Sequence, residues 1–417
     1  MIEIDTKAFI QAKFGEYYGK SSAIVPPPTS IEKREFGFLL MKEGVMLRHR
    51  SFKTPEELRD SLKRLVPSNV YFSSAYYERP EEKMDEKGWI GADLVFDIDA
   101  DHIPTPCAKN HNTWICANCS TTGLGRSPEK CPTCKGQRFK EKAWPCEVCL
   151  ESAKQETMKL IDILTKDFGL ATKEMSLGFS GHRGYHLHVE RKEILTLDSM
   201  SRKEIVDYIV AIGLEPRMHG LREHGSRGIA GPNLNDLGWK GRIAQGTYDF
   251  LQSATPAQLE KIGLGKETIH SLSEHKNSIL KSWEDKGPWG AIRGVGTESW
   301  SKIVEQAVKR QTSEIDTVVT TDIHRLIRLT NTLHGKTGLR KTGAAIATIE
   351  KFDPLKRAVA FPQGTATIFV SEAPEFRIGD EFHGPYRNER VELPMAAALF
   401  LLCKEAASVV EEGSSVR

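Results

Sequence analysis

The sequence lacks a long apolar run, a strong net charge and cysteines spread along the chain. The longest apolar run, Met395 to Cys403, has 9 residues, whereas a helix needs about 20 to span a bilayer. Lysine and arginine exceed aspartate and glutamate by only 2, so the net charge indicates no particular partner. The opening segment has no basic stretch before an apolar core, so we expect neither a secretory signal nor contact with a membrane.

The composition is that of an ordinary globular protein. Apolar residues make up 39% of the 417 residues and charged residues 27%, which argues against a disordered or fibrous chain. At roughly 100 to 200 residues per domain, this length predicts two or three domains. The apolar run that follows Pro394 predicts a buried C-terminal helix, and we expect Cys403 within it to be a core residue.

The cysteines are concentrated in one window. Seven of the 8 lie between Cys107 and Cys149, and three CxxC pairs occur there with eleven residues between successive pairs. Such clustering predicts zinc binding in a soluble protein of a reducing compartment, and it disfavours a chain-wide disulfide framework. With Cys107 and His111 added to the pairs there are eight ligands, the number that two tetrahedral zinc ions require.

Two partitions of these eight ligands are possible. In the more local one, the four residues of a ribbon bind one zinc and four residues at its base bind the other. The ribbon would use Cys116, Cys119, Cys131 and Cys134, and the base would use Cys107, His111, Cys146 and Cys149. Sites closed by four cysteine or histidine ligands are structural, so we expect two structural zinc ions and no open catalytic position.

The run DLVFDID, from Asp93 to Asp99, predicts a short, mostly buried strand. Side chains alternate along a strand, so Asp97 and Asp99 project to one face. Converging carboxylates repel each other unless a cation neutralises them, which predicts a site for Mg²⁺ or Mn²⁺; a solvated strand end is the alternative. A calcium loop is excluded, because His102 and Ala108 stand where it requires glycine and glutamate.

A basic turn follows downstream. Two strand-like pieces, MSLGF and YHLHV, flank the sequence SGHRG. Its glycines permit a tight turn that brings backbone N–H groups close to an anion, with Ser180, Arg183 and His186 as candidate phosphate ligands. The alternative for His186 is a structural histidine within the strand.

A second basic segment contains Arg328, His334 and Lys336. Its Gly-Lys-Thr does not end a P-loop, because Thr330 stands where that motif requires glycine. The three side chains could form a second anion clamp or belong to an exposed polar turn.

Between these motifs the sequence pattern predicts helices. The segment from about 195 to 305 predicts an insertion, in which Ser201 and Glu204 suggest a capping box. A Gly-rich basic stretch within it is either a solvated loop or a nucleic-acid surface. Later strands are predicted at Thr317 to Thr320, Ala358 to Phe361 and Thr367 to Val370.

The DLVFDID strand, the cysteine-rich stretch, the SGHRGYH turn and the RLIR and TLHGKTG segments occur in this order between about Arg34 and Pro354. In their order and in their residues these segments resemble the catalytic (small) subunit of archaeal and eukaryotic DNA primase. The sequence HGKTGL is more similar to the archaeal form.

The resemblance implies an α+β fold with an archaeo-eukaryotic primase core, a mixed sheet flanked by helices. An inserted zinc-binding module and a helical subdomain would interrupt it. The implied boundaries are residues 1–102, 150–195 and 305–395 for the core, 103–150 for the zinc insertion, 195–305 for the helical insertion and 395–417 for a C-terminal helix and tail.

The resemblance also implies roles for particular residues. Asp97, Asp99 and Asp316 match the ligands of two catalytic Mg²⁺ or Mn²⁺ ions. The nucleotide-binding residues implied are Arg48, Ser180, Arg183, His186, Arg328, His334 and Lys336. The family knuckle corresponds to the base site that includes Cys146 and Cys149, and the four-cysteine ribbon departs from the family pattern.

The implied activity is that of a DNA-directed RNA polymerase, a nucleotidyltransferase that makes short primers on single-stranded DNA from nucleoside triphosphates. A large primase subunit would complete a heterodimer within the replication machinery, in the cytoplasm of an archaeal-type cell or the nucleus of a eukaryote. The alternatives are a primase-polymerase that acts in repair and a zinc-stabilised nucleic-acid binding protein without catalysis.

Overall fold

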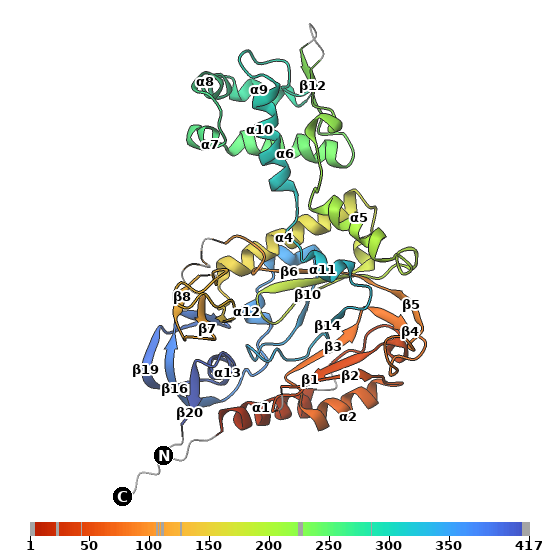
Figure 1. Cartoon of the computed structure of the whole chain (residues 1–417), viewed down its shortest axis with the longest axis vertical. Coiled ribbons are helices and arrows are strands. Elements are labelled where there is room, and N and C mark those ends of the chain that lie inside the picture. The colour runs from red at the N-terminus through yellow and green to blue at the C-terminus, as the bar shows by residue number, and fades with distance from the viewer. Residues whose placement is uncertain are drawn as a thin grey trace, which may run out of the picture. The chain divides into compact units, whose positions relative to one another are not determined.

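The computed structural model describes most of the chain and divides it into two compact units. The described residues are 5–21, 25–42, 44–105, 107, 109, 112–125, 127–223, 228–284 and 286–410. The first unit comprises Met1–Thr157, Thr172–Lys203 and Ile315–Arg417, and the second comprises Met158–Ala171 and Glu204–Glu314. Figure 1 labels their helices and strands. None of the described helices has both the length and the apolar character needed to cross a membrane.

Two four-stranded sheets form the centre of the first unit. The first, in the order β14-β3-β1-β2, contains β1 (Phe36–Leu39), β2 (Met46–Arg50), β3 (Asn69–Ser73) and β14 (Leu326–Arg328). The second, in the order β15-β10-β11-β6, contains β6 (Leu94–Asp99), β10 (Met175–Phe179), β11 (Gly184–Val189) and β15 (Thr342–Ala344).

The strand directions differ from the mixed sheet that we expected. Every strand pairing in the described part of the chain is antiparallel, in both central sheets and in the smaller ones. Short turns such as that between β10 and β11 reverse the chain, and a reversed chain pairs antiparallel with the strand it has just left.

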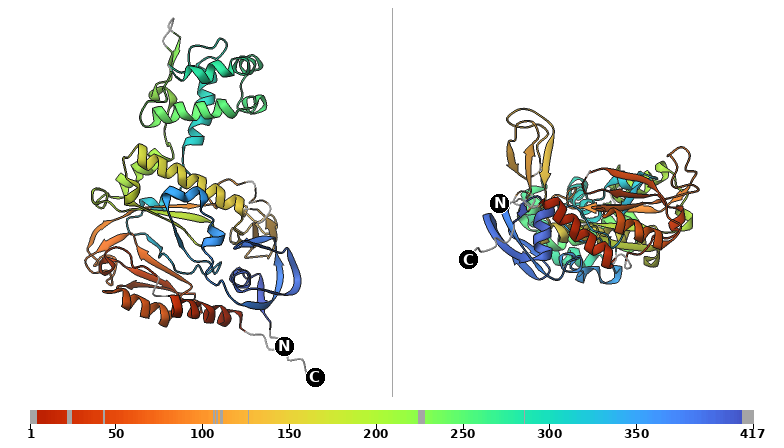
Figure 2. Two further views of the ribbon diagram at one scale, coloured as in Figure 1. Left: turned by 180° about the vertical axis from the view of Figure 1, so that it is seen from behind. Right: turned by 90° about the horizontal axis from the view of Figure 1, so that it is seen from below.

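Smaller sheets surround this centre. They consist of β4 (Ala75–Tyr77) with β5 (Trp89–Ala92), β7 (Thr113–Cys116) with β8 (Thr122–Leu124) and β9 (Phe139–Lys142), β16 (Thr365–Ala373) with β19 (Tyr386–Pro394) and β20 (Ala407–Val409), and β17 (Phe376–Ile378) with β18 (Glu381–His383). The right-hand view of Figure 2 shows the β7–β9 ribbon extending away from the central sheets.

The helices of the first unit include the expected C-terminal one. They are α1 (Thr6–Ser21), α2 (Pro55–Leu65), α11 (Thr317–Thr321), α12 (Pro354–Arg357) and α13 (Met395–Cys403), with short 3-10 turns at Ile31–Lys33, Thr172–Glu174, Lys192–Ile194 and Ile346–Lys351. Two longer helices, α4 (Glu147–Lys166) and α5 (Ser199–Ile209), continue from the first unit into the second.

The second unit is mainly helical. It contains α6 (Trp239–Ser253), α7 (Pro256–Lys261), α8 (Lys266–Glu274), α9 (Lys276–Ser282), α10 (Thr297–Gln311), a 3-10 turn (Pro216–His219) and the short strands β12 (Arg222–Glu223) and β13 (Ile229–Ala230). Trp289 packs between Trp283 and Trp300, with ring centroids 5.4 and 4.9 Å away. These buried aromatic contacts give the unit its own core.

Three local predictions were wrong. The segment Thr317 to Thr320 forms helix α11, because the Asp316 carboxylate caps it by accepting from two backbone N–H groups at 2.9 and 3.3 Å. Ala358 to Phe361 lies outside any strand. The capping group of α5 is Asp198, whose Oδ1 accepts from the N–H of Ser201 at 2.8 Å.

A buried arginine ties the two central sheets together. Arg34 donates to the carbonyl oxygens of Ser73 and Ser74, at the end of β3, at 3.0 and 2.7 Å. Its other nitrogen lies 2.7 Å from the carboxylate of Asp93, which immediately precedes β6. Both side chains of this ion pair are about 1% exposed. Because Arg34 contacts both sheets, it fixes where β6 begins.

We predict that Arg34→Met lowers the free energy of unfolding by about 3 to 5 kcal/mol, because the buried Asp93 carboxylate loses its counter-charge. Chemical denaturation of the purified chain measures this change. The control is Arg191→Met, which breaks an exposed pair with Glu193 and should cost at most about 1 kcal/mol. Equal losses in the two variants would show that the Arg34 contact is not structural.

Candidate active site

Two acids and a histidine face each other across β6 and β11. In the register of this pair His186 lies opposite Asp97, and Gly184 lies opposite Asp99. The His186 Nε2 atom is 3.5 Å from Asp97 Oδ1. At Gly184 a Cβ would approach the carbonyl oxygen of Ile98 to 2.2 Å. Glycine therefore permits the close approach of β11 to the end of β6 that carries the acids.

The third predicted acid reaches the same place from the segment before α11. The Asp316 N–H donates to the carbonyl oxygen of Asp97 at 2.8 Å. Burial, and then the charges of Asp99 and Asp316, raise the pKa of Asp97 to about 7. Ionisation of Asp97 is therefore unfavourable at this buried position beside the other two acids.

The three aspartates fit a divalent cation in chemistry. In the described part of the chain, the groups of three or more donor atoms within 4.8 Å of one another consist of cysteines, so the three carboxylates are not drawn together that closely. However, a bound cation would offset both the burial of the Asp97 carboxylate and its repulsion by Asp99 and Asp316, which together raise its pKa. Carboxylate oxygens are also the ligands that Mg²⁺ and Mn²⁺ prefer.

The glycine-rich turn between β10 and β11 is ordered by Ser180. Its Oγ accepts from the N–H groups of His182 and Gly184, each at 3.3 Å. Arg183, about 1% exposed, pairs with the carboxylate of Asp101 and donates to Asn112 Oδ1 at 3.3 Å. In this structure the guanidinium is therefore engaged by neighbouring protein groups.

His334 lies beside this turn. Its Nδ1 accepts from the N–H of Lys336 at 3.1 Å, and its ring stacks on His182 with centroids 5.0 Å apart. Burial lowers the pKa of His334 well below its usual value, so the imidazole is neutral. Because Nδ1 accepts, the proton is on Nε2, which can donate to an anion.

Arg328 approaches the acids from β14. It donates to Asn69 Oδ1 and, at 3.3 Å, to the hydroxyl of Tyr71. It is about 7% exposed, and the negative charge of Asp97 partly offsets the cost of its burial. The guanidinium is therefore held close to the acids by side chains of β3.

One pocket of about 170 Å³ gathers most of these groups. Six predicted residues line it, namely Asp97, Asp99, Ser180, His186, Arg328 and His334. Asp316 contacts the backbone of Asp97 next to it, and the charge of Lys336 acts on the carboxyl of Asp99. Arg48 is not among the lining residues; it pairs with Glu35 at 2.9 Å.

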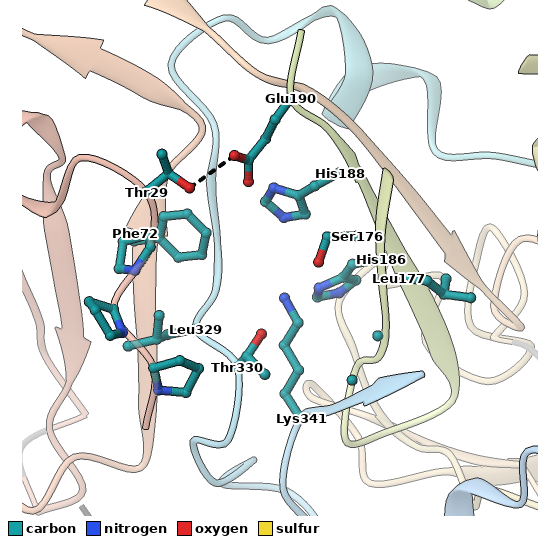
Figure 3. A pocket seen from close by; sticks show the side chains of 15 residues that line it. Thr29, Phe72, Ser176, Leu177, His186, His188, Glu190, Leu329, Thr330 and Lys341 are labelled. Atoms are coloured by element: carbon teal, nitrogen blue, oxygen red, sulfur yellow. Dashed lines mark hydrogen bonds between the residues drawn. The ribbon is translucent and has the colours of Figure 1, made fainter. Parts of the chain in front are cut away.

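A second pocket, of about 230 Å³, adjoins the first at His186, which lines both. Figure 3 shows the His186 and His188 rings on one side of the pocket, Phe72 and Leu329 on the other, and Lys341 extending from below toward His186. Lys341 Nζ donates to the carbonyl oxygen of Arg328 at 2.6 Å, and burial lowers its pKa to about 7. Phe72 stacks on His188 with centroids 5.6 Å apart.

Sequence reasoning missed several groups of this site. Tyr71, His182 and Arg325 line the first pocket, and the buried Lys404 lies 2.9 Å from His182. His182 stood in the quoted turn but was not singled out. Lys404 did leave a signal, because it is the charged residue directly after the apolar run that forms α13. Arg325 opens the quoted RLIR segment but was likewise not singled out. Tyr71 lies in none of the quoted motifs.

The cysteines form two groups. The sulfur atoms of Cys116, Cys119, Cys131 and Cys134 lie within 4.8 Å of one another, and so do those of Cys107, Cys146 and Cys149. None of these cysteines is in a disulfide. The hydrogen bond from Thr121 lowers the pKa of Cys119 to about 6, which favours the thiolate that zinc binds. His111 lies outside the described residues, so its contribution to the second group stays a prediction.

An acidic strand end, neutral buried histidines and a buried guanidinium around one pocket suit an enzyme that handles phosphorylated substrates. The model of the DNA primase small subunit family matches residues 133–344. The chain belongs to the DNA primase small subunit family, and it is of the archaeal type.

Relatives match along nearly the whole chain. The DNA primase small subunit PriS of Archaeoglobus fulgidus is 37% identical over 407 residues, which cover 97% of this chain and 98% of that protein. The proteins of the same name from Methanothrix thermoacetophila and Nitrosopumilus maritimus are 34% and 31% identical, each over 98% of this chain and 100% of its own length.

One hydrogen bond joins the two segments that are predicted to bind an anion, and it can be tested. Thr337 Oγ1 donates to the carbonyl oxygen of Gly181 at 2.6 Å in a buried position. We predict that Thr337→Val destabilises the chain by about 1 to 3 kcal/mol, because this carbonyl loses its buried donor. Denaturant unfolding measures the change. The control is Thr321→Val, which removes a bond within exposed helix α11 and should cost about 0.5 kcal/mol or less; a Thr337 variant as stable as this control would contradict the prediction.

Proposed function

We propose that this chain is the catalytic subunit of a primase that joins nucleoside triphosphates into short primers on a single-stranded DNA template. The observation that carries the proposal is the placement of Asp97 opposite His186 and of Asp99 opposite Gly184, with Asp316 hydrogen-bonded to the Asp97 backbone. Membership of the primase small subunit family supports it.

In the proposed reaction the primer 3′-hydroxyl gives up its proton to water, and its oxygen forms a bond to the α-phosphorus of the incoming nucleotide. The bond from that phosphorus to the bridging oxygen breaks, and pyrophosphate leaves. Asp97, Asp99 and Asp316 would hold two Mg²⁺ or Mn²⁺ ions. When bound, such ions acidify the attacking hydroxyl and neutralise charge on the phosphates.

The protein groups around the acids bind and orient the triphosphate in this proposal. The neutral His334 donates its Nε2 proton to a phosphate oxygen, because Nδ1 already accepts from Lys336 N. Arg328 supplies a fixed positive charge near the acids, and Ser180, which orders its turn by accepting from two backbone N–H groups, lines the same pocket. Preorganised donors of this kind stabilise the charge of the transition state.

Of the remaining predicted contacts, Arg183, Lys336 and Arg48 need movement to reach the nucleotide. Arg183 pairs with Asp101, and Arg48 pairs with Glu35, whereas Lys336 is exposed beside His334. We propose that a bound triphosphate draws Arg183 and Lys336 toward the pocket. We propose that Arg48 contacts the nucleotide only when a bound template or primer has moved Arg48 closer to the pocket.

We further propose that the two cysteine groups bind structural zinc. The ribbon group offers four thiols on the knuckle-like turns after β7 and before β9. The second group offers Cys107, Cys146 and Cys149, with His111 as the proposed fourth ligand. Since the ribbon is additional to the family knuckle, we assign it rigidity or template contact.

The proposal includes a partner. A small subunit of a primase implies a large subunit, and we propose a heterodimer that works within the replication machinery. A repair primase-polymerase shares the same core chemistry but would extend preformed ends without starting chains. A zinc-stabilised binding protein would incorporate nothing.

We predict that Asp97→Asn reduces nucleotide incorporation on unprimed single-stranded DNA by about a hundredfold or more, because metal-based stabilisation is worth several kcal/mol. Incorporation of labelled nucleotide by the purified chain is the measurement. The matched control is Asp85→Asn on an exposed loop, which should leave incorporation unchanged. Full activity of the Asp97 variant would contradict the assignment of Asp97 as a catalytic metal ligand. If the wild-type chain only extends preformed ends, the repair primase-polymerase is favoured instead.

Metal analysis tests the zinc proposal separately. We expect about two zinc ions per chain by elemental mass spectrometry. Cys131→Ser should lower this to about one, since the ribbon loses a ligand and the second group keeps its own. Cys403→Ser changes a buried cysteine outside both groups and should retain the full content. A wild-type value of one zinc would refute the two-site arrangement.

A further inference from the structure

A buried lysine joins three segments of the first unit beside the nucleotide pocket. Lys404 follows α13 directly and is about 7% exposed. Its Nζ lies 2.9 Å from His182 Nε2 in the turn between β10 and β11. The same atom donates to the carbonyl oxygen of Ala143 at 2.7 Å, between the β9 ribbon strand and α4. A lysine buried at this depth is costly, so its two acceptors are the groups that hold it there.

The contact with Lys404 determines how His182 is protonated. Burial lowers the pKa of His182 well below its usual value, so the ring is neutral and has one N–H. Because the lysine nitrogen has N–H groups to donate whether or not it is protonated, we assign Nε2 as the acceptor and place the proton on Nδ1. The ring is thereby fixed in tautomer and orientation, as a metal-bound histidine is fixed by its outer hydrogen bond.

The oriented His182 ring in turn supports His334. The two rings are nearly parallel, with an interplanar angle of 10° and centroids 5.0 Å apart. Both line the pocket that contains Asp97 and Asp99. A shift of the His182 ring would therefore displace the ring on which His334 stacks. His334 is the proposed hydrogen-bond donor to the triphosphate.

The position of Lys404 depends on the β7–β9 ribbon. Lys140 Nζ lies 2.5 Å from the Glu405 carboxylate, and Lys142 Nζ donates to the Glu405 carbonyl oxygen at 2.9 Å. Both lysines belong to β9, and Ala143 follows them directly. The end of α13 is thus attached to the strand that leads from one cysteine group to the other.

We infer that Lys404 is a positioning residue for nucleotide binding: through its hydrogen bond it holds His182 against His334 and connects the cysteine-bearing ribbon to the pocket. This inference rests on the proposed function, because His334 is taken as a triphosphate ligand. Lys404 itself is not assigned a contact with the reacting atoms.

The test compares Lys404→Met with wild type in steady-state incorporation and in binding of a nucleoside triphosphate by calorimetry. Methionine fills the space but cannot donate. We expect KM and the dissociation constant to rise about tenfold, with kcat changed less than threefold, since the ring that orients His334 is loosened. Lys404→Gln retains an N–H donor, so its KM and dissociation constant should lie between those of wild type and Lys404→Met. This variant also provides the test if the methionine variant does not fold.

A double-mutant cycle makes the test specific to one hydrogen bond. His182→Phe keeps a ring to stack on His334 but has no nitrogen to accept. In that background Lys404→Met should add no further rise in the dissociation constant, because the bond it removes is already absent. Additive effects, or a single variant with unchanged nucleotide affinity, would overturn the inference.

The matched control is Lys154→Met in α4. Lys154 is also about 7% exposed and donates to a backbone carbonyl, that of Glu350, but it does not contact His182. It should leave the dissociation constant unchanged. If wild type incorporates no nucleotide, the proposed function fails, whereas the affinity measurements still decide the role of Lys404.

Discussion

The burial of Asp97 beside two further carboxylates is the constraint on which the rest of the first unit depends. The side chains of Asp97 and Asp99 project from one face of β6, and the backbone nitrogen of Asp316 donates to the carbonyl oxygen of Asp97 at 2.8 Å. Burial and the two neighbouring charges raise the pKa of Asp97 to about 7. This grouping costs folding free energy until a cation is bound, so the structure around β6 has to hold it in place.

That support comes from contacts that place whole segments. Arg34 joins the first central sheet to Asp93 at the start of β6, and Gly184 lets β11 approach its other end. The Asp316 side chain caps α11, while its backbone N–H donates to the Asp97 carbonyl oxygen. One residue thus both starts helix α11 and holds the segment before it against β6. Around the acids, the His182 and His334 rings are fixed by hydrogen bonds from Lys404 and the Lys336 backbone.

Sequence reasoning succeeded where a local pattern carries the information. The alternation in DLVFDID placed Asp97 and Asp99 on one face of a strand, and the SGHRGYH turn was read as a reversal between two strands. It failed where tertiary contacts decide. The valine and threonine residues after Asp316 favour a strand, yet the Asp316 cap makes them a helix. The role of Lys404 depends on His182, which is more than two hundred residues away in the chain, so no local pattern could indicate it.

The most direct test of the central claim is the thermal stability of metal-free wild type and Asp97→Asn, measured at about pH 8 with and without Mg²⁺. A carboxyl whose pKa is raised in the folded state contributes stability at low pH and loses it as the pH rises through about 7. The metal-free Asn variant should therefore melt at a higher temperature than metal-free wild type, and Mg²⁺ should stabilise wild type much more than the variant. A variant that is less stable than wild type without metal, or that gains as much from Mg²⁺, would contradict the account.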